Sequence, residues 1–346
     1  MQAHPSRIPA PARPEVDSRS RWARISSVRD QRWWPWFKRA VTLAFFGLVA
    51  WLIINQARNV DWSQVVESMR QRSWGVLALA ALLAASSHLT YSSFDLFGRR
   101  VTGHCLPKLR VMAITFISYI FNLNLGSLIG GMAFRFRLYS RQGLKAETIT
   151  TIVATSMLTN WLGYLLIGGL VLLIAPPALP PDWPIAGAPL RLAGASMLAV
   201  ALAWQLACLL SKRREWQVGS TTITLPSARV AALQLLASSF NWALMAGVIY
   251  VLFEQRIDFP LALATLLVAA VAGVIAHVPA GLGVLEAVFV AMIGDKLPHA
   301  EVIGTLLLYR ALYYLAPLGL AIFMQWRVEA TAKRVRNTDA AGEPRA

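Results

Sequence analysis

Apolar residues fall in eight long blocks separated by short polar segments, at 40–55, 74–97, 111–134, 149–174, 191–210, 230–252, 261–294 and 302–325. A helix needs about 20 apolar residues to cross roughly 30 Å of hydrocarbon. The blocks are continuous, whereas the strands of an outer-membrane barrel alternate apolar and polar residues. The pattern therefore predicts an all-α polytopic integral membrane protein.

Two of the blocks are irregular. The block 111–134 carries polar or flexible residues in its second half, namely Asn122, Asn124, Gly126, Gly130 and Gly131. The block 261–294 is too long for one crossing and contains HVPAGLGVLE at 277–286. Irregular backbone is tolerated at membrane depth only where it is buried in protein or lines a cavity. We expect two re-entrant or broken hairpins, and a plain span remains the alternative for 111–134.

Basic residues set the predicted orientation, because cytoplasmic loops are enriched in Lys and Arg. The segments 98–110 and 135–147 each hold several basic residues, as does KRRE at 212–215, so we expect all three on the cytoplasmic side. The proline-rich segment 175–190 holds no Lys or Arg and is expected outside. Both termini are then expected on the cytoplasmic side.

The predicted domains are a disordered basic cytoplasmic arm at 1–39, a transmembrane domain at 40–326 and a cytoplasmic tail at 327–346. About six full spans and two broken hairpins make up the transmembrane domain. The net charge is +16, which we attribute to loops beside anionic lipid, so no nucleic acid partner is expected. Cys105 and Cys208 are expected at or near the cytoplasmic side, without a disulfide.

The two halves share one plan, with two spans, a broken hairpin and a further span. The first half starts inside and the second starts outside, so we expect an inverted repeat. Interrupted segments at matching places in two inverted halves are typical of a transporter site near the midplane of the membrane.

The motif around Pro279 suggests a helix break. Proline lacks an N–H group and clashes with the preceding turn, so a helix is expected to end near His277. Gly281 and Gly283 permit unusual backbone angles, and a new helix is expected to begin around Val284. Its N-terminus would be an anion site suited to a lipid phosphate. The alternative is a kink that serves only helix packing.

Two ionisable residues lie at predicted membrane depth. Glu286 falls in the first turn of the new helix, where it either caps the helix or acts as a counter-charge for a cationic headgroup or as a proton carrier. Arg310 requires a partner, and either a lipid phosphate or Glu286 would serve. Tyr313 and Tyr314 are expected near Arg310 on its helix, and Pro317 leaves the carbonyl of Tyr313 without a helical donor.

Weaker candidates are His277, which also suits a core or interface position, and Arg135, which also suits a snorkelling side chain at the membrane interface. His88 and Asp95 are seven residues apart and are expected on one helix face. The sequence holds no nucleophile–base pair, P-loop or metal-ligand spacing. We therefore expect no catalytic residue, metal or cofactor.

The segments HVPAGLGVLEAVFVAMIG and LLLYRALYYLAPLGLA resemble the membrane domain of the lysylphosphatidylglycerol synthase/flippase family. Ala280 departs from the usual Pro-Gly-Gly. The resemblance implies a location in the inner (plasma) membrane of a bacterium and a membrane domain that moves a lipid between leaflets. In fused members a soluble domain transfers an aminoacyl group. The chain stops at Ala346, soon after its last span, so we expect no synthase activity and no enzyme.

The expected function is that of a flippase-type lipid translocase acting on a phospholipid or modified phospholipid. The alternatives are a non-transporting partner of a lipid-modifying enzyme, or a proton-coupled carrier of small solutes. The expected partners are anionic or aminoacylated phospholipids, while a homo-oligomer and a lipid-modifying enzyme remain open.

Overall fold

The computed structural model describes residues 62–327, apart from 178–187, 213–214, 219–220 and 277–280. The predicted arm, the predicted span at 40–55 and the tail beyond residue 327 lie outside the described residues. The described chain is almost entirely helical, as the apolar pattern predicts.

Within the described residues, six helices are long and apolar enough to cross a membrane. They are Trp74–Thr102, Ala146–Ile174, Ala188–Leu210, Ala228–Leu252, Phe259–Ala276 and His299–Arg327. Five of them coincide with blocks predicted as full spans. The remaining one, Phe259–Ala276, is the first limb of the predicted broken block 261–294.

The first half begins with α3 (Trp62–Arg70), α4 (Trp74–Ser92) and α5 (Phe94–Thr102). The hydroxyls of Thr90, Ser92 and Ser93 donate to nearby backbone carbonyls. These bonds compete with the backbone hydrogen bonds of the helix and favour the junction between α4 and α5. The expected loop at 98–110 is wrong in extent, because α5 continues to Thr102. The amphipathic end of this span remains helical beyond its apolar part.

The block 111–134 forms a helical hairpin, which excludes the plain-span alternative. Helix α6 (Lys108–Leu125) ends at Gly126, and the chain returns through the π-helix η1 (Ser127–Ala133) and α7 (Phe134–Arg141). The rings of Phe121 and Phe134 stack with centroids 4.0 Å apart across the hairpin. The segment 135–147 is therefore helical as far as Arg141, and not a loop throughout.

Close approach of the two limbs depends on Gly130. A Cβ atom at this position would overlap the main-chain carbonyl of Phe121, and no rotamer change relieves a clash with backbone. At Gly131 the corresponding atom would lie 2.9 Å from the side-chain oxygen of Asn122. The glycine pair thus lets η1 pack directly on α6.

Helix α8 (Ala146–Ile174) leads to α9 (Ala188–Leu210) and then to a small antiparallel hairpin of β1 (Glu215–Val218) and β2 (Thr221–Thr224). This hairpin is the one departure from an all-α fold in the described part of the chain. Helix α10 (Ala228–Leu252) follows. Its most apolar window is 61% buried, against 17% for α9, so α10 is central and α9 peripheral.

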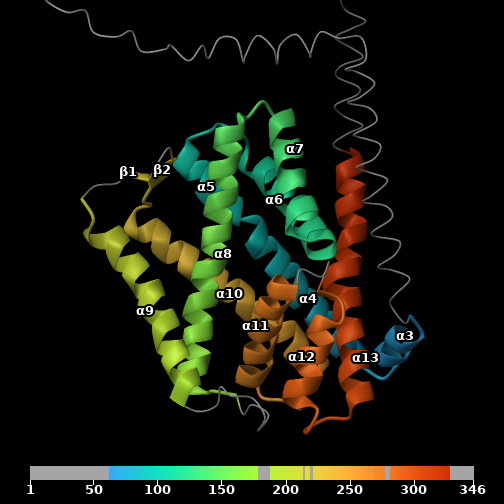
Figure 1. Cartoon of the computed structure of the whole chain (residues 1–346). Coiled ribbons are helices and arrows are strands. Elements are labelled where there is room, and N and C mark those ends of the chain that lie inside the picture. The colour runs from blue at the N-terminus through green and yellow to red at the C-terminus, as the bar shows by residue number, and fades with distance from the viewer. Residues whose placement is uncertain (1–61, 178–187, 213–214, 219–220, 277–280, 328–346) are drawn as a thin grey trace, which may run out of the picture. The chain divides into compact units, whose positions relative to one another are not determined.

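The second half closes with another hairpin and a long helix. Helix α11 (Phe259–Ala276) and α12 (Val284–Ile293) pack side by side, and α13 (His299–Arg310) continues through the π-helix η3 (Ala311–Leu315) as far as Arg327. The hairpins enter the bundle from opposite ends, α6–η1–α7 from the end where α5 finishes and α11–α12 from the other (Figure 1). This arrangement is an inverted repeat with two broken hairpins.

Candidate functional site

The helix break in the second hairpin lies where the sequence predicts it. Helix α11 ends at Ala276 and α12 begins at Val284, while His277 and Pro279 lie outside the described residues. Gly283 caps α12 with a φ of 76°, a left-handed conformation that side-chain-bearing residues rarely adopt. Gly281 also has a positive φ, of 57°. The N-terminus of α12 is thereby placed at the inner end of the hairpin.

Arg310 joins this break to the long closing helix. Its Nε donates to Oε1 of Glu286 at 2.5 Å, and one terminal nitrogen donates to Oε2 at 3.0 Å and to the carbonyl of Gly281 at 2.8 Å. The Arg310 side chain is 2% exposed and that of Glu286 is 16% exposed. In the described conformation Glu286 is thus the counter-charge of Arg310, and the second option for Arg310, a phosphate, would require this pair to open.

Tyrosine rings surround the ion pair. The guanidinium carbon of Arg310 lies 5.6 Å from the centroid of the Tyr314 ring, within the range of a cation–π contact. Tyr309 packs edge-to-face on Tyr314 at 5.9 Å. Its hydroxyl is buried and has no hydrogen-bond partner among the described residues. Sequence reasoning missed Tyr309, although its place beside Arg310 in the YRALYY run was an available signal.

Tyr313 belongs to a neighbouring polar cluster of α4, α6 and α10. Its hydroxyl lies 2.7 Å from the hydroxyl of Ser87 and 3.3 Å from that of Tyr119, and Ser87 donates to Asn241 at 2.8 Å. Both tyrosines lie in the π-helix at 311–315. The Tyr313 side chain points to the polar cluster, and the Tyr314 side chain points to Arg310. The sequence expected Tyr313 and Tyr314 together beside the guanidinium, whereas only Tyr314 has a described contact with it.

Both hairpins contact the same stretch of the closing helix. Asn124, just before the turn at Gly126, donates to the main-chain oxygen of Tyr314 at 3.3 Å and to that of Ile120 at 2.8 Å. Gly281, at the break of the second hairpin, accepts from Arg310. The inner ends of the two inverted hairpins therefore meet at residues 310–314.

Arg135 occupies a separate buried cluster, and the interpretation as a snorkelling side chain is wrong. It is 3% exposed, and its Nε and a terminal nitrogen donate to Asp95 at 3.1 and 3.2 Å. Ser156 and Tyr139 complete the contacts, at 3.2 Å to the guanidinium and 2.9 Å to the carboxylate. The cause is the packing of α7 against α8, which encloses the start of the return limb.

His88 and Asp95 do not act as one polar stripe. A helix junction at Ser93 separates them, so His88 faces Tyr313 while Asp95 pairs with Arg135. The described residues contain no group of three or more His, Cys, Asp or Glu side chains placed to hold a metal. Cys105 is exposed and Cys208 is buried, and neither forms a disulfide.

The sequence matches the family described as the lysylphosphatidylglycerol synthase TM region over residues 39–321. The chain is 39% identical to the inner membrane protein YbhN of Escherichia coli over 304 residues, covering 88% of this chain and 96% of that protein. It is 30% identical to the uncharacterized protein slr0712 of Synechocystis, covering 82% and 88% of the two chains.

A third relative is the phosphatidylglycerol lysyltransferase of Staphylococcus haemolyticus, 24% identical over 304 residues. That match covers 81% of this chain and 32% of the lysyltransferase. The family match covers most of the chain, and the structure has six candidate membrane spans among its described residues. Together with the relatives, these findings establish the family. The chain belongs to the lysylphosphatidylglycerol synthase transmembrane-region family and is a multi-pass inner membrane protein.

Proposed function

We propose that this protein is a lipid translocase that moves a phospholipid headgroup between leaflets by way of Arg310. The observation that carries the proposal is a buried guanidinium held by Glu286 at the broken end of a hairpin. A charge at membrane depth is costly and marks a substrate path more often than a structural support. The lysyltransferase relative makes phosphatidylglycerol or its lysylated form a reasonable first lipid to test.

The geometry suits an exchange of anions. Glu286 occupies Arg310 with both carboxylate oxygens, and a lipid phosphate offers the same two-oxygen arrangement. The N-terminus of α12 adds a positive dipole end beside the same position. A phosphate that displaces Glu286 would keep the guanidinium paired throughout, so Arg310 is never left as an unpaired buried charge.

The inverted hairpins supply a means of alternating access. The hairpins enter from opposite ends and their inner ends meet on the same few residues of the closing helix (Figure 1). Movement of one hairpin relative to that helix would open the site toward one leaflet, and movement of the other toward the opposite leaflet. The proposal also includes the orientation predicted from the basic segments, with both termini in the cytoplasm.

The test is lipid movement in proteoliposomes that contain fluorescent phosphatidylglycerol, with accessibility to an external quencher as the readout. We expect Arg310→Ala to slow the movement at least about tenfold, because one charge-assisted contact to phosphate contributes that much. Arg310→Lys should retain part of the rate. Arg70→Ala, on the amphipathic helix α3, is the matched control and should move lipid at the unmodified rate. Equal rates for Arg310→Ala and the unmodified protein would refute the translocase.

A second function, as a non-transporting partner of a lipid-modifying enzyme, is favoured by one observation. The chain matches only part of a phosphatidylglycerol lysyltransferase, so a related membrane domain occurs within a lipid-modifying enzyme. Such a partner should retain its cellular role in Arg310→Ala and Glu286→Ala variants. Isolation of the protein with such an enzyme, combined with no lipid movement in proteoliposomes, would favour this function over transport.

A further inference from the structure

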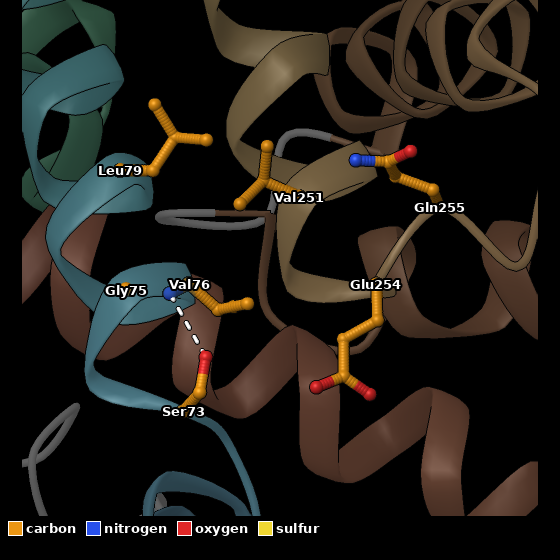
Figure 2. A pocket seen from close by; sticks show the side chains of 7 residues that line it. All are labelled: Ser73, Gly75, Val76, Leu79, Val251, Glu254 and Gln255. Atoms are coloured by element: carbon orange, nitrogen blue, oxygen red, sulfur yellow. Dashed lines mark hydrogen bonds between the residues drawn. The ribbon is translucent and has the colours of Figure 1, made fainter.

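A pocket of about 400 Å³ lies between the start of α4 and the end of α10. Its lining combines the polar residues Ser73, Glu254 and Gln255 with the apolar residues Val76, Leu79 and Val251. Figure 2 shows the Ser73 hydroxyl and the Glu254 carboxylate toward one end, and Leu79 and Val251 toward the other. We propose that this pocket binds the headgroup of an aminophospholipid, a lipid with a phosphodiester and a primary ammonium group.

The ammonium would bind at Glu254. Oε2 of this carboxylate accepts from Arg72 at 3.0 Å, and Oε1 has no described hydrogen bond within residues 62–327. The Glu254 side chain is 38% exposed, so it remains accessible while Arg72, at 8%, lies behind it. A carboxylate has lone pairs for about four donors, and an ammonium supplies three N–H groups. The exposed oxygen is thus a fitting acceptor for a primary amine.

The phosphate would bind at the start of α4. Ser73 is the N-cap of this helix and its hydroxyl accepts from the backbone N–H of Val76 at 3.3 Å. The first N–H groups of a helix and its dipole favour an anion. Gly75 leaves this backbone uncovered, since a Cβ there would meet nothing closer than the Ser73 hydroxyl at 3.8 Å.

Arg72 holds the Glu254 carboxylate in place from behind. Its terminal nitrogens contact Glu254, the hydroxyl of Thr305 at 3.1 Å and the more distant Glu301 at 3.8 Å. Its Nε is buried and has no hydrogen-bond partner among the described residues.

The backbone that presents Glu254 is strained. Glu254 and Gln255 have φ values of 52° and 62°, in the left-handed region that residues with side chains enter at a cost of about 1–2 kcal/mol each. These angles close the C-terminal turn of α10, in which the N–H of Gln255 donates to the carbonyl of Tyr250 at 3.1 Å. The turn directs the carboxylate and the amide into the pocket from the end of α10.

The acyl chains would follow α4. Leu79 and Leu82 are exposed on this helix at 45% and 63%, continuing the apolar end of the pocket. Trp74 is 85% exposed at the start of the helix, and such tryptophans favour the headgroup level of a bilayer. The proposal rests on the translocase function, in which this pocket would hold a headgroup at the external leaflet before or after passage by Arg310.

Native mass spectrometry of the full-length protein in detergent can test the pocket with three probes. These are phosphatidylethanolamine, phosphatidylethanolamine with an acetylated amine, and phosphatidylglycerol. We expect the first to bind at least about tenfold more tightly than the other two, because only it offers an ammonium to Glu254. Glu254→Gln should abolish this preference, while Glu67→Gln, an exposed acid on α3, should preserve it.

Two further variants separate this site from the one at Arg310. Val251→Trp should fill the apolar end and weaken phosphatidylethanolamine and its acetylated form alike. Arg310→Ala should leave the preference for the free amine over the acetylated amine intact. Preference retained in Glu254→Gln, or lost in Arg310→Ala alone, would overturn the pocket. Lipid movement without this preference would refute the pocket and leave the translocase standing. The preference without lipid movement would refute the translocase and leave the pocket standing.

Discussion

His88 donates from its Nε2 to the main-chain oxygen of Tyr313 at 3.1 Å. This carbonyl is the one that Pro317 leaves without a helical N–H donor, because it lies four residues before the proline. An imidazole on α4 thus replaces a hydrogen bond missing from the closing helix. The contact also fixes the tautomer, since a carbonyl only accepts and Nε2 must carry the proton.

The first prediction concerns this replacement. His88→Phe keeps an aromatic ring beside Tyr119 and Tyr313 but removes the donor, so it should lower the free energy of unfolding by about 1–3 kcal/mol. In a Pro317→Ala background the backbone regains its N–H group, and the same substitution should cost clearly less. A double-mutant cycle measured by denaturant unfolding in detergent gives the difference. An equal loss of unfolding free energy in both backgrounds would show that His88 does not replace the hydrogen bond that Pro317 removes.

A second prediction concerns the buried pair of Asp95 and Arg135, both under 5% exposed. Removal of one charge leaves the other buried and unpaired, which typically costs about 3–5 kcal/mol. Asp95→Leu and Arg135→Met should therefore each destabilise the protein strongly. The double variant should be more stable than either single variant, as thermal unfolding in detergent will measure. Glu67→Leu, on exposed α3, is the control and should change stability little.

The sequence predicts most of the fold because the bilayer imposes simple rules on it. Continuous apolar runs have few outcomes besides a spanning helix, so five described spans fall where expected. The break before Val284 is equally local, since proline and glycine alter the backbone wherever they occur. Arg310 at depth demands a partner, and Glu286 was one of two partners anticipated.

Residues that meet only through packing are harder to anticipate. Asp95 and Arg135 are 40 residues apart in the chain, and their pairing follows from the packing of α6 on α5 and of α7 on α8. The contact of Asn124 with Tyr314 joins two halves of the molecule, and no spacing within either half predicts it. Tyr309 was missed for a different reason. It adjoins Arg310 in the sequence, but an apolar helix tolerates tyrosine, so the residue type alone does not imply a site.

A third prediction follows from competition between Glu286 and phosphate for Arg310. Glu286→Gln weakens the internal partner, so phosphatidylglycerol should bind at least about tenfold more tightly, as measured by native mass spectrometry. Its movement across the bilayer should become slower, because the headgroup is released less readily. Arg310→Ala should change binding in the opposite direction. If Glu286→Gln bound the lipid more weakly, Glu286 would be a direct ligand of the headgroup and not its competitor.

The fourth prediction concerns orientation. Cys105 lies exposed between α5 and α6, and Asp295 lies exposed between α12 and α13, at the opposite end of the bundle (Figure 1). With cytoplasmic termini, a membrane-impermeant maleimide should label Cys105 only after cells are permeabilised. It should label an Asp295→Cys variant, in a Cys105→Ser background, in intact cells. Buried Cys208 is the internal control and should stay unlabelled in both. The reverse pattern would invert the topology.

The fifth prediction tests the packing of the first hairpin with two glycines. Gly130→Ala places a methyl group against the backbone of Phe121, which cannot yield without separating η1 from α6, so it should destabilise the protein by about 1–3 kcal/mol or more. Gly273→Ala is the matched control. It lies within α11 with open space around its Cβ position, and alanine there should raise stability by about 0.5–1 kcal/mol through helix propensity.

Thermal unfolding in detergent measures both effects, and lipid movement in proteoliposomes adds a second readout. Gly130→Ala should slow movement even where the protein remains folded, because Asn124 then loses its position beside Tyr314. Gly273→Ala should leave movement unchanged, because open space surrounds its Cβ position and the methyl group displaces no neighbouring atom. Should Gly130→Ala prove as stable and as active as the unmodified protein, close packing at the turn would be dispensable, and the first hairpin would have no demonstrated part in the site around Arg310.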